Sequence, residues 1–172
     1  MLLLCGLGST VVRAQGIELV SLETLRQDGD LSLDFEVRLA LPKSVEDAMH
    51  RGVPVYFVAD ATLYRNRWYW RDERVARVQR SWRVAYQPLT SIWRVGFGGF
   101  NQNFQTLAEA LTAASRSSRW KVADTALLDP ESRYYLDFSY RLDTSQLPSP
   151  MQIGLGGQAE WVLGVERQLR LE

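Results

Sequence analysis

Few residues of this sequence carry the side chains that acid–base or nucleophilic catalysis requires. The 172 residues include one histidine, His50, and one cysteine, Cys5. The common nucleophilic arrangements place a base beside the nucleophile, so here all of them would depend on His50. That residue falls in the last turn of a predicted helix, where a cation is favoured by the helix dipole. A metal site would lack a second imidazole ligand. We therefore predict no catalytic residue, no bound metal and no cofactor.

Paired carboxylates are the second chemical candidate, because glycoside hydrolysis uses two of them around the scissile bond. The pairs Asp72/Glu73 and Asp137/Asp143 could be considered for this role. Adjacent residues of a strand point to opposite faces, however, and charged turns are usually solvated. A hydrolase is therefore the weaker hypothesis, without an assigned reaction class.

Arginine and aromatic residues crowd together in one short segment, and this cluster is the candidate binding site. It comprises Arg65, Arg67, Trp68, Tyr69, Trp70, Arg71 and Arg74. Such residues can stack on a partner protein, sit at a membrane interface or grip an anionic glycan or headgroup. In an alternative arrangement Trp68 and Trp70 fold back on a sheet, while the arginines cover them and pair with Asp72 and Glu73.

The overall composition is that of a globular protein without a nucleic-acid partner. Hydrophobic residues make up 46% of the chain and charged residues 23%, with 20 basic and 20 acidic side chains. A dedicated nucleic-acid binder carries a basic excess, so this class is not predicted. The length is that of one domain with a sizeable core.

The elements that position the cluster follow from alternation of apolar and polar residues, which is typical of half-buried strands. Such alternation predicts a hairpin of strands 53–63 and 76–86 that turns near Arg71–Arg74. On the second strand Ala76, Val78, Trp82, Val84 and Tyr86 share a face. Further strands are predicted over 17–26, 31–41, 92–97, 120–123, 134–142 and 159–171.

Two short helices complete the prediction. The first spans Lys43–Arg51, with Ser44 able to cap it and Gly52 placed to end it. The second begins at the capping box Thr106-Leu107-Ala108-Glu109 and frays into the polar run Ser115–Arg119. The predicted fold class is mainly β, an antiparallel β-sandwich or strongly curved sheet with two short helices.

The amino-terminal segment suggests export. Residues 1–14 contain a short apolar region followed by Val12-Arg13-Ala14, which resembles a signal-peptidase site, without the usual positive start. We interpret them as a truncated signal peptide, followed by a single β-rich domain over residues 15–172. The expected location is periplasmic or otherwise exported, with association to the membrane left open.

A curved sheet could also form a cup that binds an apolar small molecule or lipid. Phe97, Phe100 and Phe104, with the glycines between them, would lie near its mouth. Nothing in the sequence separates this arrangement from a filled core.

Several ordered segments resemble an exported bacterial family of uncharacterised proteins, the domain of unknown function 4390. They are LPKSVEDAMHRGVPVYFV, WYWRDERVARVQRSWRVAYQPLT, TLAEAL and RLDTSQLPSPMQI, and the likeness spans Ile17 to Leu163. The resemblance implies a bacterial envelope location and hints at a membrane sensor kinase as partner, with no established activity. The expected function is thus an exported, non-catalytic binding or structural module of the cell envelope. Its partner would be an envelope protein or the membrane surface.

Overall fold

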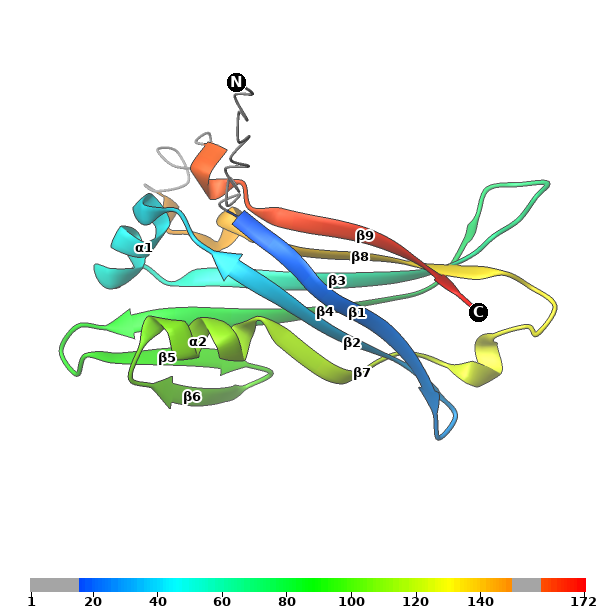
Figure 1. Ribbon diagram of the computed structural model, residues 1–172, viewed down its shortest axis with the longest axis horizontal. Coiled ribbons are helices and arrows are strands. Elements are labelled where there is room, and N and C mark those ends of the chain that lie inside the picture. The colour runs from blue at the N-terminus through cyan, green and yellow to red at the C-terminus, as the bar shows by residue number, and fades with distance from the viewer. Residues whose placement is uncertain (1–15, 150–158) are drawn as a thin grey trace, which may run out of the picture.

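The protein is a two-layered assembly of antiparallel strands (Figure 1), which confirms the predicted mainly β, sandwich-like fold class. The computed structural model describes residues 16–149 and 159–172, so the predicted signal peptide at 1–14 lies outside them. The small sheet has the order β1 (Gly16–Gln27), β2 (Asp30–Ala40) and β7 (Arg116–Asp124). The large sheet has the order β6 (Phe100–Phe104), β5 (Ile92–Phe97), β4 (Glu73–Gln87), β3 (Val55–Arg65), β8 (Tyr134–Leu142) and β9 (Gly164–Leu171).

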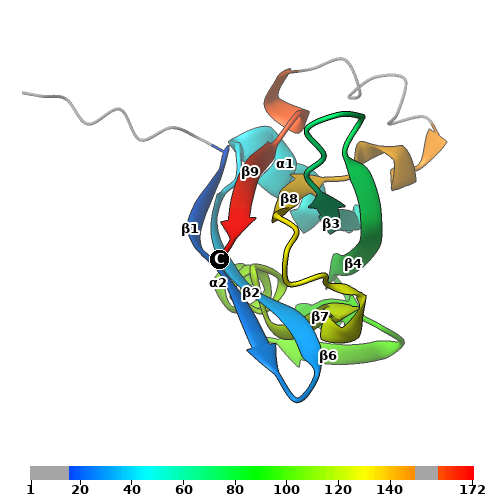
Figure 2. The same ribbon diagram turned by 90° about the vertical axis from the view of Figure 1, so that its right-hand side faces the viewer.

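The two sheets face each other across one core. At one side of the molecule β9, the edge of the large sheet, contacts β1 of the small sheet (Figure 2). Helix α1 (Lys43–His50) contacts β4, and helix α2 (Leu107–Ala114) contacts β4, β5 and β6. None of the helices in the described residues is long and apolar enough to cross a membrane.

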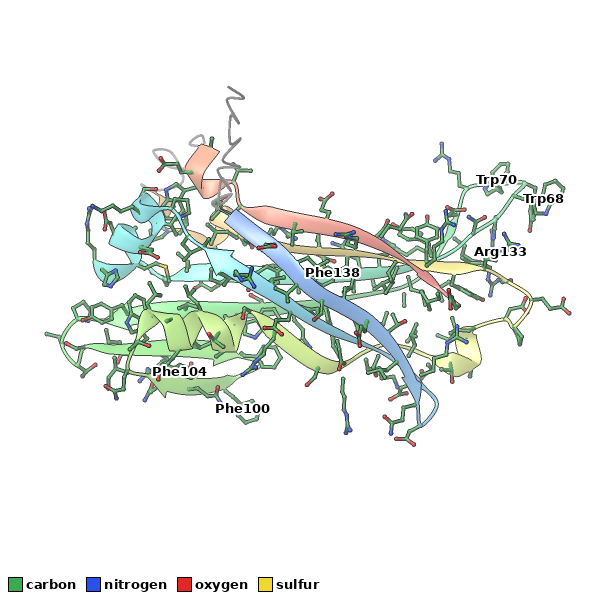
Figure 3. The ribbon with its side chains drawn as sticks, in the orientation of Figure 1. Trp68, Trp70, Phe100, Phe104, Arg133 and Phe138 are labelled. Atoms are coloured by element: carbon green, nitrogen blue, oxygen red, sulfur yellow. The ribbon has the colours of Figure 1, made fainter. Side chains whose placement is uncertain are left out.

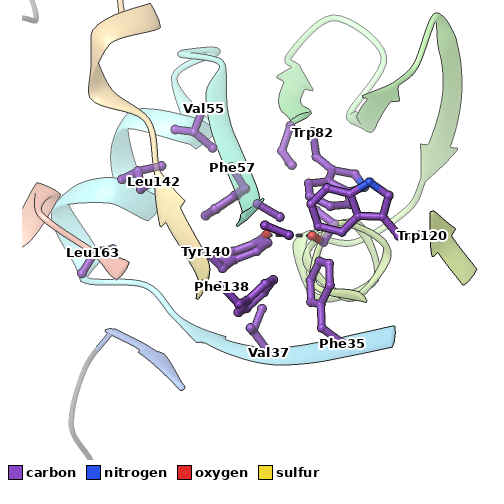
Figure 4. Packing of buried hydrophobic residues seen from close by; sticks show 14 of the residues in the cluster. Phe35, Val37, Val55, Phe57, Trp82, Trp120, Phe138, Tyr140, Leu142 and Leu163 are labelled. Atoms are coloured by element: carbon purple, nitrogen blue, oxygen red, sulfur yellow. Dashed lines mark hydrogen bonds between the residues drawn. The ribbon is translucent and has the colours of Figure 1, made fainter. Parts of the chain in front are cut away.

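The core is built from the inward faces of both sheets (Figure 4). At its centre Phe35 of β2 has its ring 5.0 Å from that of Phe138 and about 6 Å from those of Trp82, Trp120 and Tyr140. All five are at most 4% exposed, and each buried aromatic contributes about 2–3 kcal/mol of hydrophobic stabilisation. The alternation predicted from the sequence is thus explained by burial of one face of each strand.

The long hairpin turns earlier than predicted. Strands β3 and β4 pair from Val55 opposite Val84 as far as Arg65 opposite Glu73, so the connection is 66–72 and the predicted turn near Arg71–Arg74 is wrong. The pairing register shifts between Leu63 and Tyr64, and Val75 is the extra residue of this bulge. The shift brings Arg65 opposite the acidic Glu73, which favours pairing over turning at this point.

The helices agree with the predictions except at one cap. Gly52 has φ 94° just after α1, a conformation that glycine adopts without strain. Ser44 does not cap this helix, because Pro42 holds the N-cap position and the Ser44 hydroxyl donates instead to Glu160 Oε2 at 2.5 Å. The capping box of α2 is confirmed, with Thr106 and Glu109 each accepting from the other's backbone N–H.

The largest differences from the predictions concern β7, β6 and β9. The polar run predicted to fray from α2 instead opens β7, which starts at Arg116 and is longer than the predicted strand 120–123. Gly98 and Gly99, both at positive φ, form a tight turn into β6, a strand that was not predicted. The last predicted strand begins later, because 159–161 form a 3-10 turn and β9 starts at Gly164.

Candidate functional site

The connection 66–72, which we call the hairpin tip, projects beyond both sheets at one end of the molecule (Figures 1 and 3). Its aromatic side chains lie in solvent, with 93% of Trp68, 66% of Tyr69 and 73% of Trp70 exposed. The Trp68 and Tyr69 rings meet edge to face, 5.4 Å between centroids. The alternative in which Trp68 and Trp70 fold back on the sheet is therefore wrong. Adjacent exposed aromatics are unusual on a monomer and typical of interaction sites.

Two of the seven predicted binding residues are used inside the hairpin. The Arg65 guanidinium lies 3.4 Å from Glu73 Oε2, and the Arg67 guanidinium contacts the same carboxylate oxygen. Arg65 Nε also donates to the Tyr134 hydroxyl at 3.1 Å, which raises the pKa of Arg65. The two arginine side chains are 28% and 29% exposed. They close the base of the tip and leave little guanidinium surface for a partner.

A second set of contacts fixes the tip to β8. The Asp72 carboxylate accepts from the Tyr135 hydroxyl at 2.7 Å and from the Arg67 backbone N–H at 3.0 Å, and these bonds lower its pKa. Desolvation and the bond to Asp72 raise the pKa of Tyr135 to about 12. The backbone N–H of Asn66 donates to the Arg133 carbonyl at 2.8 Å. The tip is thus held at both ends while its three aromatics remain free.

The other two predicted arginines remain available. Arg71 and Arg74 are exposed, and neither forms an ion pair within the part of the chain that the structure describes. Arg74 also lines a groove of about 680 Å³ on the outer face of the large sheet, where Asp60 and Arg77 lie. Arg71 follows the three exposed aromatics directly in the chain, whereas Arg74 lies on β4, beyond the tip.

A second groove, of about 490 Å³, lies at the base of the tip and was not predicted. It is lined by Asn66 and Asp72 of the tip, by Arg133 and Tyr135 beside or on β8, and by Arg170 on β9. Arg170 is the register partner of Tyr135. The strand order β3-β8-β9 creates this juxtaposition, and no local sequence pattern signals it.

On the outer face Asp60 forms a closed charge network. It is 8% exposed, and its carboxylate accepts from Arg77 Nε at 2.8 Å and Arg77 Nη2 at 3.1 Å, with Arg141 at 3.7 Å. The bonds from Arg77 are the main cause of its lowered pKa. A carboxylate held in its ionised form is suited to fixing strands together and poorly suited to donating a proton.

The residues considered for catalysis lie in separate environments. His50 is exposed, with Nδ1 2.8 Å from the Glu46 carbonyl oxygen and its ring 5.1 Å from that of Trp93. Asp137 accepts from Gln168, and Asp143 caps the turn at Ser145. In the described residues no three His, Cys, Asp or Glu side chains are grouped closely enough to hold a metal ion.

The aromatic residues suggested for a cup are divided between two environments. Phe97 and Phe100 line a pocket of about 350 Å³ between β5, β6 and α2, whereas Phe104 packs half-buried against the core (Figure 3). The space between the sheets is occupied by the core aromatics.

Comparison with known proteins gives one match. The family model described as "Domain of unknown function (DUF4390)" matches residues 14–170. No curated protein and no solved structure matches the chain.

Proposed function

The chain belongs to the DUF4390 family, and we propose that it is an exported, non-catalytic binding module of the bacterial cell envelope. It contacts a protein partner through the hairpin tip. The observation that supports this proposal is the exposure of Trp68, Tyr69 and Trp70 on a loop whose base is fixed by Glu73 and Asp72. Aromatic anchors on a rigid support lose little conformational entropy on binding.

A protein surface fits the surroundings of the tip better than a lipid surface does. The groove beneath the tip presents both signs of charge, with Asp72 beside Arg133 and Arg170. A polar rim of mixed charge around aromatic anchors is typical of protein interfaces. An anionic headgroup layer would favour a uniformly basic surface instead. Among envelope proteins, a membrane sensor kinase is the first candidate partner.

Site-specific photo-crosslinking in envelope fractions tests the proposal. A benzoylphenylalanine replaces Tyr69 in one variant and Leu89 in the other, because Leu89 is fully exposed in the turn between β4 and β5. We expect a discrete protein adduct from position 69, absent from position 89 and strongly reduced when Trp68→Ala and Trp70→Ala are combined with it. Identical adducts at both positions, or adducts that persist in the double variant, would contradict the proposal.

A vesicle assay separates the protein partner from the membrane. Vesicles of phosphatidylglycerol and phosphatidylethanolamine are sedimented with the native chain and with the Trp68→Ala/Trp70→Ala variant. We expect no sedimentation of either. If the native chain sediments and the variant does not, the tip binds lipid and the proposed protein contact is wrong.

A further inference from the structure

The pocket lined by Phe97 and Phe100 lies away from the tip, where β4, β5 and β6 of the large sheet approach β7 and α2. Its volume is about 350 Å³. Its walls combine the aromatic rings of Trp82, Phe97 and Phe100 with two cations, Arg80 and Arg116, and with the hydroxyl of Ser117. We propose that this pocket binds a small amphipathic anion, in which a carboxylate is joined to an apolar group.

The cation of the pocket is Arg80, which lies on the inward face of β4. Its register partner on β3 is the fully buried Ala59. The guanidinium carbon lies 5.3 Å from the ring centroids of both Phe97 and Trp120, so it is held between one aromatic from each sheet. One of its amino groups donates to the Ser117 hydroxyl. The side chain is thus fixed in position, with desolvation lowering the pKa of Arg80 although it remains a cation.

The positive charge of Arg80 has no acidic counterpart in the part of the chain that the structure describes. Within residues 16–149 and 159–172 it forms no ion pair, and none of the residues that line the pocket is acidic. Arg116 adds a second positive charge at the wall. By contrast, the buried Asp60 on the other face of the sheet is paired with two arginines. Partly buried charges are usually paired, so a bound anion would give Arg80 the counter-charge that the neighbouring side chains do not supply.

The remaining donors of Arg80 suit a carboxylate. A guanidinium has five N–H donors and binds a carboxylate through two parallel bonds. The structure assigns one amino group of Arg80 to Ser117. A ligand carboxylate would therefore find a donor pair fixed in advance between two aromatic faces.

The rest of the pocket suits an apolar group. The rings of Trp82 and Phe97 stack with centroids 5.4 Å apart and planes 16° apart, and Val95 and Ala113 extend the apolar wall. Phe97 is 36% exposed, so the pocket is accessible from solvent. A volume near the lower limit of small-molecule sites favours a short chain or a single ring over a lipid.

Sodium octanoate, with octanol and octylamine as probes of equal length and different charge, tests this assignment. Binding is followed by NMR through the indole N–H signals of Trp82 and Trp120. We expect octanoate to shift both signals with a dissociation constant at least about tenfold lower than that of octanol. A carboxylate paired with a guanidinium binds more strongly than a neutral hydroxyl does. Octylamine should cause no shift. Equal affinity for octanoate and octanol, or no binding of octanoate, would overturn the proposal.

Arg80→Met keeps the aliphatic length of the side chain and removes its charge. It should lose the preference for octanoate over octanol, whereas Arg83→Met on the outward face of the same strand should retain it. If Arg80 serves only to link the two sheets, Arg80→Met will lower the stability of the fold, and the native chain will show no preference for octanoate over octanol.

If Arg80→Met does not fold, Ala113→Met provides the test, because the longer side chain narrows the pocket from α2 without altering its charge. Undiminished octanoate binding in that variant would refute the site.

The pocket and the tip can be tested independently. The Trp68→Ala/Trp70→Ala variant should bind octanoate as the native chain does, and Arg80→Met should retain the crosslink at position 69. Loss of octanoate binding therefore bears only on the pocket, and loss of the crosslink at position 69 bears only on the tip.

Discussion

The hairpin tip and the Arg80 pocket use the same residue types in opposite arrangements. At the tip the aromatics are exposed, and Arg65 and Arg67 share the carboxylate of Glu73. In the pocket Trp82 and Trp120 are buried in the core, whereas Phe97 and Phe100 face solvent at the mouth. Among the described residues the guanidinium of Arg80 forms no ion pair with an acidic side chain. The comparison shows that an Arg/aromatic cluster can offer either apolar surface or charge. Which one it offers depends on where the acidic residues lie.

The largest difference between the two regions is expected in the stability of variants that lack a tryptophan. Trp120→Ala removes a side chain that is 4% exposed and should lower the free energy of unfolding by about 3–5 kcal/mol. Trp68→Ala should change it by less than about 0.5 kcal/mol, because the side chain is almost entirely in solvent. Urea denaturation measures both values. Similar losses for the two variants would contradict the division between scaffold and contact surface.

Removing the Asp60 carboxylate from the outer face should weaken the ion-pair network there. Asp60→Asn removes the ion pairs of Arg77 and Arg141 with Asp60 and should lower the free energy of unfolding by about 1–3 kcal/mol, the range for hydrogen bonds to charged groups.

The same substitution should reduce the acid sensitivity of the fold. The folded-state pKa of Asp60 lies below its usual value of 3.8, so its ion pairs stabilise the fold above that pH. The stabilisation is lost as the pH falls through the folded-state pKa. Denaturation curves between pH 7 and pH 2 should therefore show a smaller loss for Asp60→Asn than for the native chain. Equal slopes would rule out this source of acid sensitivity.

Glu73→Gln should loosen the base of the tip. The ion pairs with Arg65 and Arg67 are partly exposed, so the expected loss of stability is about 0.5–1 kcal/mol. The crosslink at position 69 should fall in parallel, because the aromatics lose their fixed support. Glu131→Gln, in the exposed loop before β8, serves as the control for loss of one acidic charge. An unchanged crosslink would show that this support is dispensable.

The smallest effect is expected from the outer arginine of the pocket. Arg116 is exposed, so its attraction for the ligand carboxylate is screened by solvent. Arg116→Gln should weaken octanoate binding about two- to threefold, less than Arg80→Met does. Isothermal titration calorimetry measures the octanoate affinity of both variants. A larger loss of affinity in Arg116→Gln than in Arg80→Met would place the ligand carboxylate nearer the mouth of the pocket.

The strands could be predicted where burial alone determines the pattern. Tyr134–Leu142 and Ile92–Phe97 have the predicted bounds, because each places alternate side chains in the core. The short β6 could not be predicted in this way, since four of its five residues are exposed and its sequence therefore lacks an apolar face.

The candidate sites were predictable in part. The crowding of Arg and Trp in the sequence points to the tip as a candidate site. That Arg65 and Arg67 form ion pairs with Glu73, and so are not available to a partner, depends on the bulge at Val75. Arg80 interrupts the apolar face of β4, because it occupies the inward position between Val78 and Trp82. A charged residue at an inward position is a signal of a site that the sequence itself contains. The groove containing Arg133 and Arg170 depends on strand order, which no local pattern contains.

The distribution of the six tryptophans gives the molecule an intrinsic optical label. Trp82, Trp93, Trp120 and Trp161 are each at most 4% exposed, whereas Trp68 and Trp70 are in solvent at the tip. Fluorescence of the folded chain should therefore contain a buried class that acrylamide hardly quenches and a red-shifted class that it quenches readily. A partner that covers the tip will shift only the second class, so its binding can be followed without attaching a dye.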